Sequence, residues 1–273
     1  MNYRHAFHAG NFGDCMKHAL LIALIHALRH KPAAVFVLDT HAGRGRYDLG
    51  SGPAQRTGEW RAGIARIMED PPPALADYVD LVTELGLYPG SPAIIRSLLR
   101  PQDRLVCCEL HPEEHAALRS LFARDPQVAV HLRDGYEAIR ALLPPSGIAR
   151  GLVLIDPPYE VGDELERVAA ALAEARHRFA AGVLAAWYPI KHRAPTRAFH
   201  GVLRASRLRD VIAAELWLRE PLDAARLNGC GLIVVNPPFG FSETALGILG
   251  ALRGRLGEHD GGDGFAVERL IDE

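Results

Sequence analysis

The segment Asp156-Pro157-Pro158-Tyr159 combines residue types that could act on the exocyclic amine of a nucleic-acid base. It ends the apolar run 151–156, which is typical of a buried strand. The lone pair of such an amine is delocalised into the ring, so the nitrogen reacts poorly unless both N–H bonds find acceptors. The Asp156 carboxylate and the Pro157 carbonyl could be those acceptors, because two prolines keep the turn rigid. Tyr159 offers a face on which an extruded base could stack.

This chemistry predicts that Asp156 orients the amine and takes up its proton as the nitrogen is alkylated. A carboxylate such as that of Asp156 would be a weak base before transfer. A strand-to-loop turn without catalytic function is the alternative interpretation. The residues upstream decide against it.

Polar residues also close the three preceding apolar runs. The first run leads into the segment 39–45, DTHAGRG, where Gly43 and its neighbours let backbone amides approach a ligand closely. Glu109 closes the second run and could accept both ribose hydroxyls of an adenosine cofactor. Asp134-Gly135 closes the third and could meet the adenine amine. Each signal alone is only a turn or a strand end. In this order the three together predict binding of S-adenosylmethionine.

Short apolar runs alternate with helical patterns along most of the chain. This alternation predicts a doubly wound α/β fold, in which ligands bind beyond the carboxyl ends of the strands. The order matches a Rossmann-like class I methyltransferase fold, with a seven-stranded, mostly parallel sheet formed by residues 1–45 and 104–273. Residues 46–103 are too long for one crossover and predict a small helical insertion. The tail predicts a loop and a short terminal strand. The seven expected strands are 34–39, 104–110, 128–134, 151–156, 182–189, 213–219 and 231–236.

Composition narrows the class of protein. The chain has 273 residues, of which 48% are hydrophobic and 23% charged, as in ordinary globular proteins. No apolar run of about 18 residues and no signal peptide is present, so we expect a cytoplasmic protein without a membrane partner. The four cysteines show neither disulfide nor zinc spacing, and Cys15 with His18 lacks a second ligand pair, so no metal is expected. We expect a monomer.

Charge argues against indiscriminate phosphate binding. The formal net charge is −2, which creates no global field for nucleic acid, although a local basic patch is compatible with it. Recognition of a small RNA element by its shape and an extruded base fits this charge better.

The N-terminal segment places aromatic, basic and histidine residues before a helix expected at 14–30. Asp14 is expected to cap this helix. Lys17 and His18 in its first turn would oppose the helix dipole. A carboxylate from the cofactor could offset that cost.

A second motif, Asn236-Pro237-Pro238-Phe239, resembles the first. Chain order assigns catalysis to Asp156, because Asp156 directly follows the cofactor strands and Asn236 closes the last strand. We expect the second motif to shape a loop near the site.

At this point the motifs resemble those of the RlmJ family, bacterial methyltransferases that modify adenine N6 in 23S ribosomal RNA. The segments that carry the resemblance are YRHAFHAGNFGDCMKH, LDTHAGRGRYDL, YPGSP, CCELHP, RDGYEA and IDPPYE. They span essentially the whole chain in the family's order. The DPPY motif alone is shared by many amino-methyltransferases.

The resemblance implies roles for individual residues. Asp156 would be the catalytic residue, Lys17 would lie beside the cofactor, and Tyr3, with its neighbour Arg4, would engage the RNA. The residues implied to contact adenosylmethionine are His18, His41, Ser91, Glu109, Asp134, Gly135 and Asp156.

Three other functions remain open from the residues alone. A DNA adenine methyltransferase would usually need a target-recognition domain, and 46–103 is small and neutral for that. A protein glutamine methyltransferase would favour asparagine at position 156. A non-catalytic RNA-binding assembly factor would not need the intact motif at 156–159. For a 23S rRNA enzyme, free RNA or an early assembly intermediate is the expected substrate, because extrusion of a base needs access.

Overall fold

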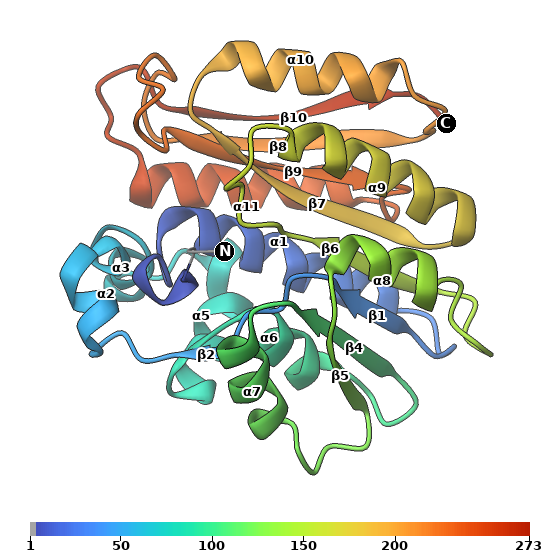
Figure 1. The fold of residues 1–273 in the computed structure, drawn as a ribbon. Helices are drawn as coiled ribbons and strands as arrows, with labels where there is room; N and C mark the ends of the chain where they lie inside the picture. Colours follow the sequence, from blue (N-terminus) through green and yellow to red (C-terminus); the bar gives the residue numbers. More distant parts are fainter. Residues whose placement is uncertain (1–3) are drawn as a thin grey trace.

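Eight strands form one sheet in the order β10-β8-β9-β7-β6-β1-β4-β5 in the computed structural model, which describes residues 4–273 (Figure 1). Strands β1, β4, β5, β6 and β7 are parallel, and β9 lies antiparallel between β7 and β8. The strands are β1 Phe36–Asp39, β4 Arg104–Glu109, β5 Val128–Leu132, β6 Gly151–Ile155, β7 Val183–Ile190, β8 Val211–Trp217, β9 Gly229–Val235 and β10 Gly264–Ile271. The predicted Rossmann-like class I methyltransferase fold is therefore confirmed.

The sheet separates two hydrophobic clusters. Adjacent β1 residues belong to different clusters, Val37 to one and Leu38 to the other, because side chains alternate across a strand. Helices α1 (Phe12–Arg29), α6 (Ser91–Leu98), α7 (Pro112–Leu121) and α11 (Phe241–Leu256) contribute to the first cluster. Helices α8 (Gly135–Leu142), α9 (Glu164–Arg178) and α10 (Arg193–Arg204) contribute to the second. No helix within residues 4–273 is both long and apolar enough to span a membrane.

Between β1 and β4 the chain forms a small two-stranded sheet and several short helices. Strand β2 (Arg46–Tyr47) pairs antiparallel with β3 (Tyr88–Pro89). The helices between them are α2 (Gly52–Thr57), α3 (Glu59–Ala62), α4 (Ile64–Glu69), η2 (Pro73–Leu75) and α5 (Ala76–Leu85). Within the insertion proposed at 46–103, α6 packs against α1 and the sheet. The remaining short helix, η1 (His5–Phe7), precedes α1.

Two local expectations are corrected. The sheet has eight strands rather than seven, because β10 pairs antiparallel with β8 along the edge. Helix α1 begins at Phe12, and its cap is Asn11, whose side chain accepts a hydrogen bond from the Asp14 backbone N–H at 3.0 Å. Asp14 is therefore not the cap; it lies buried inside the first turn and accepts from the Gly10 N–H at 3.0 Å.

The Asn236-Pro237-Pro238-Phe239 motif and Asp156 lie at opposite ends of the strands in the sheet. Strand β9 runs antiparallel to β7, so its last residue, Val235, pairs with Leu184 near the start of β7. The Asn236 side chain donates to the Gly182 carbonyl at 3.1 Å, and Phe239 is fully exposed. The expectation that this motif shapes a loop near the site is wrong, because the inverted strand carries it away.

One buried hydrogen bond joins the proposed insertion to the end of strand β1. The Ser91 hydroxyl, at the start of α6, donates to Asp39 Oδ2 at 2.6 Å, and Asp39 is 0% exposed. Burial raises the pKa of Asp39 to about 7, with a smaller contribution from the charge of Asp156. A carboxyl whose pKa is raised on folding stabilises the fold in its protonated form, and this stabilisation is lost as the pH rises through the folded pKa.

We predict that Asp39→Asn gains stability relative to the wild type as the pH rises. Asparagine keeps an acceptor for Ser91 but never ionises. The difference in free energy of unfolding between variant and wild type should grow by about 1–2 kcal/mol from pH 5 to pH 8. Urea unfolding at several pH values measures it. A difference independent of pH would contradict the assignment.

Candidate active site

A cavity of about 980 Å³ opens beyond the carboxyl ends of the parallel strands, within the usual size range of ligand sites. Residues far apart in the sequence meet there, because the carboxyl ends of parallel strands all lie at the same end of the sheet. The predicted residues that line this cavity are Lys17, His18, His41, Gly43, Ser91, Glu109, Asp134, Gly135, Asp156, Pro157, Pro158 and Tyr159.

Glu109 and Gly43 hold two neighbouring strand ends together. The Gly43 N–H donates to Glu109 Oε2 at 2.9 Å, and the His111 N–H donates to Oε1 at 2.6 Å. Burial raises the pKa of Glu109. Gly43 has φ +60°, and a Cβ there would lie 2.3 Å from the Tyr47 hydroxyl oxygen. The turn after β1 therefore requires glycine, as its sequence suggested.

Asp134 and Gly135 form the beginning of α8. Asp134 Oδ1 accepts from the Tyr136 N–H at 2.8 Å and the Glu137 N–H at 3.0 Å. A Cβ on Gly135 would lie 2.3 Å from the Thr40 carbonyl oxygen, so only glycine allows the two turns to come this close. Both residues therefore have structural roles at the edge of the cavity.

His41 is a neutral group in this cavity. Its Nδ1 lies 2.8 Å from the Thr40 hydroxyl, and its ring meets Tyr136 edge-on at 5.2 Å between centroids. Burial lowers the pKa of His41 to about 4.

His18 is neutral as well. Burial lowers the pKa of His18 to about 3, so it adds no positive charge to α1. Because α1 begins at Phe12, His18 also lies in the second turn, and the predicted conflict with the helix dipole does not arise there. Its Nδ1 lies 3.0 Å from the Tyr88 hydroxyl oxygen. Its Nε2 is buried and has no hydrogen-bond partner among residues 4–273. Because His18 lines the cavity, this nitrogen is suited to a polar ligand group.

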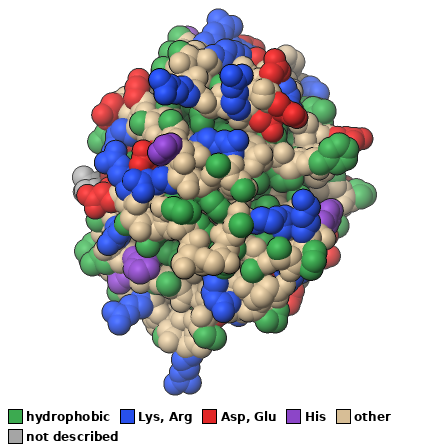
Figure 2. Space-filling model, turned by 90° about the vertical axis from the view of Figure 1, so that its right-hand side faces the viewer, with side chains coloured by type: hydrophobic (Ala, Val, Ile, Leu, Met, Phe, Trp, Pro, Cys, Tyr) green, Lys and Arg blue, Asp and Glu red, His purple; other side chains and the backbone are tan. Residues whose placement is uncertain are grey.

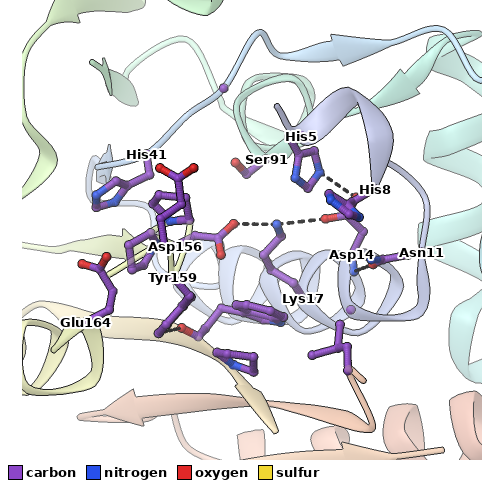
Figure 3. Close-up of a pocket in the computed structure, with 18 of the residues that line it drawn as sticks. His5, His8, Asn11, Asp14, Lys17, His41, Ser91, Asp156, Tyr159 and Glu164 are labelled. Carbon is purple, nitrogen blue, oxygen red and sulfur yellow. Dashed lines mark hydrogen bonds and ion pairs between the residues drawn. The ribbon is translucent and has the colours of Figure 1, made fainter. Parts of the chain in front are cut away.

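The Lys17 ammonium lies between two carboxylates (Figure 3). Its Nζ is 2.6 Å from Asp156 Oδ2 and 3.0 Å from Asp14 Oδ1, and the side chain is 6% exposed. Burial opposes its charge, but the two carboxylates outweigh burial and hold the pKa of Lys17 well above its ordinary value. The charge of Lys17, which lies in the second turn because α1 begins at Phe12, is thus compensated by the protein itself, whereas the sequence suggested compensation by a cofactor.

Asp14 is stabilised as an anion from both sides. Burial opposes its charge, yet His5 and Lys17 hold the pKa of Asp14 well below the usual range. His5 Nε2 lies 2.8 Å from Asp14 Oδ2. The N-terminal segment is therefore joined to α1 and, through Lys17, to the end of β6.

Tyr159 turns back onto β7. It has φ +53°, its ring meets Trp187 edge-on at 5.8 Å, and its hydroxyl donates to the Trp187 carbonyl. Both rings line the cavity next to Asp156. Trp187 was missed in the sequence because it lies inside an apolar run, where a core position is the simpler interpretation.

Further cavity residues come from segments that carried no motif. Glu59 of α3 binds the N-terminal segment, with Oε1 2.9 Å from His8 Nδ1 and Oε2 accepting from Asn11 Nδ2 at 3.0 Å. Lys191 follows β7, and Arg226 lies in the loop before β9. No local pattern distinguishes these three from ordinary surface charges.

The structure describes one of the two residues that are expected to engage RNA. Tyr3 lies outside the described residues. Arg4 is exposed, and its guanidinium lies 3.2 Å from Glu113 Oε2 on α7, outside the set of residues that line the cavity. Among residues 4–273, no group of three His, Cys, Asp or Glu side chains is arranged to hold a metal ion.

The sequence matches known proteins along nearly its full length. Residues 32–267 match the family described as ribosomal RNA large subunit methyltransferase D, RlmJ. The chain is 41% identical over 264 residues to ribosomal RNA large subunit methyltransferase J of Escherichia coli K12, covering 94% of each. It is 40% identical over 248 residues to the protein of the same name from Haemophilus influenzae, covering 88% of each.

A solved structure shows the same fold. A crystal structure of a Legionella pneumophila protein superposes with a TM-score of 0.87 at 35% identity, over 96% of this chain and 98% of that one. Together with the family match and the two relatives, this shows that the chain belongs to the RlmJ family of ribosomal RNA large subunit methyltransferases.

Proposed function

We propose that the protein transfers a methyl group from S-adenosylmethionine to the exocyclic N6 of an adenine in 23S ribosomal RNA. The observation that carries this proposal is the position of Asp156-Pro157-Pro158-Tyr159. The motif lines one cavity together with all of the residues expected to contact the cofactor. The names of the two relatives, both large-subunit rRNA methyltransferases, support RNA as the substrate.

The residues that line the cavity fit an adenosine cofactor carrying an amino acid group. Glu109 would accept from the ribose hydroxyls, and Asp134 would receive the adenine amine. The buried, unpartnered His18 Nε2 would meet the amino acid end, beside Ser91. When bound, adenosylmethionine supplies an electrophilic methyl group on its sulfonium.

Asp156 and its neighbours would hold the adenine. Lys17 pairs with Asp156 Oδ2, so Oδ1 is the carboxylate oxygen available to one amine N–H, and the Pro157 carbonyl takes the other. Trp187 and Tyr159 wall the cavity beside this carboxylate and would contact the base. As the nitrogen becomes cationic, Asp156 accepts its proton. Fixing both acceptors before reaction lowers the barrier, because nothing must reorganise during transfer.

The remaining expectations are part of the same proposal. We propose a monomer that acts in the cytoplasm on free rRNA or an early assembly intermediate. Extrusion of an adenine into a cavity requires an accessible strand, and a finished subunit restricts that access.

We predict that the protein, given labelled adenosylmethionine, forms N6-methyladenosine in unmodified 23S RNA and not in 16S RNA, duplex DNA or protein extract. Asp156→Asn should lower the rate by about 10²- to 10³-fold, because one fixed acceptor is lost from the transition state. Nucleoside analysis of digested products measures transfer, and calorimetry of cofactor binding measures occupancy of the site in parallel.

The possible outcomes separate the alternatives. Label only in DNA or only in protein would refute the RNA substrate while keeping the methyltransferase activity. Cofactor binding without transfer to any substrate would favour a non-catalytic RNA-binding factor. Intact subunits methylated faster than naked RNA would refute the proposed assembly stage.

Two exposed basic side chains that line the cavity suggest where RNA phosphates bind. Lys191 is exposed and has no ion-pair partner among residues 4–273, and Arg226 has only a distant one, 3.8 Å from Glu258. These charges stand out because the net charge of the chain is −2. Figure 2 shows the face of the molecule at the other end of the parallel strands, where basic side chains are scattered among apolar and acidic ones.

We predict that the double variant Lys191→Ala/Arg226→Ala binds an rRNA fragment about tenfold more weakly, because two phosphate contacts are lost. The slope of log affinity against log salt concentration should fall by about 1.5. Fluorescence anisotropy across a salt series measures both. The matched control is Lys31→Ala/Arg209→Ala. Both of these residues are exposed and precede strands β1 and β8, at the other end of the sheet from the cavity, so this variant should bind as the wild type does. Equal losses in the two double variants would exclude a specific phosphate site.

A further inference from the structure

The backbone of the N-terminal segment 5–11 lies directly against the turn between α3 and α4. The Ile64 N–H donates to the Gly10 carbonyl at 2.9 Å. A Cβ on Gly63 would lie 2.1 Å from the same carbonyl oxygen, so only glycine allows the two backbones to come this close. Whatever fixes α3 and α4 therefore also fixes the segment that precedes α1.

Glu59 of α3 adds two side-chain contacts to this backbone contact. Its Oε2 lies 3.0 Å from Asn11 Nδ2, and its Oε1 lies 2.9 Å from His8 Nδ1. Burial opposes the charge of Glu59, but the bonds to His8 and Asn11 outweigh burial and lower the pKa of this carboxyl group. An ionised carboxylate only accepts hydrogen bonds, so both nitrogens donate to it.

Asn11 passes this constraint on to α1. The carboxylate of Glu59 can only accept and the Asp14 backbone N–H can only donate, so the amide between them has a single suitable orientation. In that orientation Nδ2 faces Glu59 and Oδ1 faces the helix, where it accepts from Asp14 at 3.0 Å. Glu59 thus fixes the side chain that caps α1.

Asp14 connects the same segment to the site. Its Oδ2 accepts from the Gly10 N–H at 3.0 Å and lies 2.8 Å from His5 Nε2. Its Oδ1 lies 3.0 Å from Lys17 Nζ, which in turn lies 2.6 Å from Asp156 Oδ2. A displaced segment would leave the buried Asp14 carboxylate without two of its partners, and the position of the ammonium beside Asp156 would no longer be fixed.

We propose that Glu59 is a positioning residue for methyl transfer, which acts through Asn11 and Asp14 to keep the Lys17 ammonium against Asp156. Figure 3 shows Asn11, Asp14, Lys17 and Asp156 in this order across the cavity. The inference rests on the proposed function, because it takes Asp156 as the group that holds the target amine. It gives the segment 46–103, from which Glu59 comes, a role in turnover.

The first test compares two glutamates of the same segment. Glu59→Ala removes both acceptors and should lower kcat for 23S RNA about tenfold, near the lower end of what a hydrogen bond to a charged group contributes. The dissociation constant of S-adenosylhomocysteine should stay within about twofold, because the residues expected to bind its adenosine are not part of this series of contacts. Glu69→Ala, exposed on α4 and outside the cavity, is the matched control and should equal the wild type.

A pair of variants at the bond itself separates positioning from general stability. Asn11→Asp keeps a good helix cap but sets a second carboxylate against Glu59, so kcat should fall as far as in Glu59→Ala. The double variant Asn11→Asp/Glu59→Gln restores a donor and an acceptor to this bond and should recover most of kcat. Failure of the double variant to exceed Asn11→Asp would contradict the proposal.

NMR of protein labelled with nitrogen-15 at lysine gives a readout independent of activity. The chain has three lysines, of which Lys17 is buried and Lys31 and Lys191 are exposed. Hydrogens of a buried, paired ammonium exchange slowly with water, so the wild type should show one sharp ammonium signal, which persists in Lys31→Arg and in Lys191→Arg. In Glu59→Ala its hydrogen exchange should be about tenfold faster.

The outcomes distinguish this inference from the proposed function. An unchanged Lys17 signal in Glu59→Ala would overturn the positioning role, whatever the activity. Equal losses of kcat and of S-adenosylhomocysteine affinity would also overturn it, because Glu59 would then act on ligand binding. If the wild type transferred no methyl group while the Lys17 signal responded as expected, the proposed function would fail and the link from Glu59 to Lys17 would hold.

Discussion

The site depends on one buried ammonium group. Lys17 belongs to α1, and the carboxylates that flank it come from its own helix and from the end of β6. A buried charge without a partner costs several kcal/mol, so burial of Lys17 is tolerated only while both carboxylates stay beside it. This requirement holds the first two turns of α1 beside the end of β6. It also explains why a lysine can be buried near the beginning of a helix in this fold.

The segment 46–103 contributes more to the cavity than its lack of motifs suggests. Glu59 binds His8 and Asn11, which precede α1. Ser91 is hydrogen-bonded to Asp39 at the end of β1. Tyr88 reaches His18 on α1. Each of these contacts joins the segment to a residue at or beside the cavity, so the segment is part of the scaffold that shapes the site.

The sequence predicted those parts of the molecule that follow local rules. Strand runs end in polar residues, and parallel strands bring those ends together, so Glu109, Asp134 and Asp156 could be assigned to one site. Parts that depend on tertiary pairing could not be predicted. Strand β9 is antiparallel to β7, so Asn236 at its end lies beside the beginning of β7 and away from the cavity. A local motif does not reveal the direction of its strand. The cap at Asn11 and the burial of Asp14 depend on contacts with His5 and Lys17 that form only in the folded protein.

Charged side chains of both signs line the cavity. Its carboxylates include Glu109, Asp134 and the pair Asp14 and Asp156 that flanks the Lys17 ammonium, and His18 and His41 are neutral because burial lowers their pKa values to about 3 and about 4. Carboxylates beside neutral histidines favour a cationic ligand such as a sulfonium, which a charged histidine would repel. RNA phosphates need positive charge, which the exposed side chains of Lys191 and Arg226 supply. A chain with a net charge of −2 can therefore serve a cation and a polyanion in one cavity, because the nearest charges weigh most at each position.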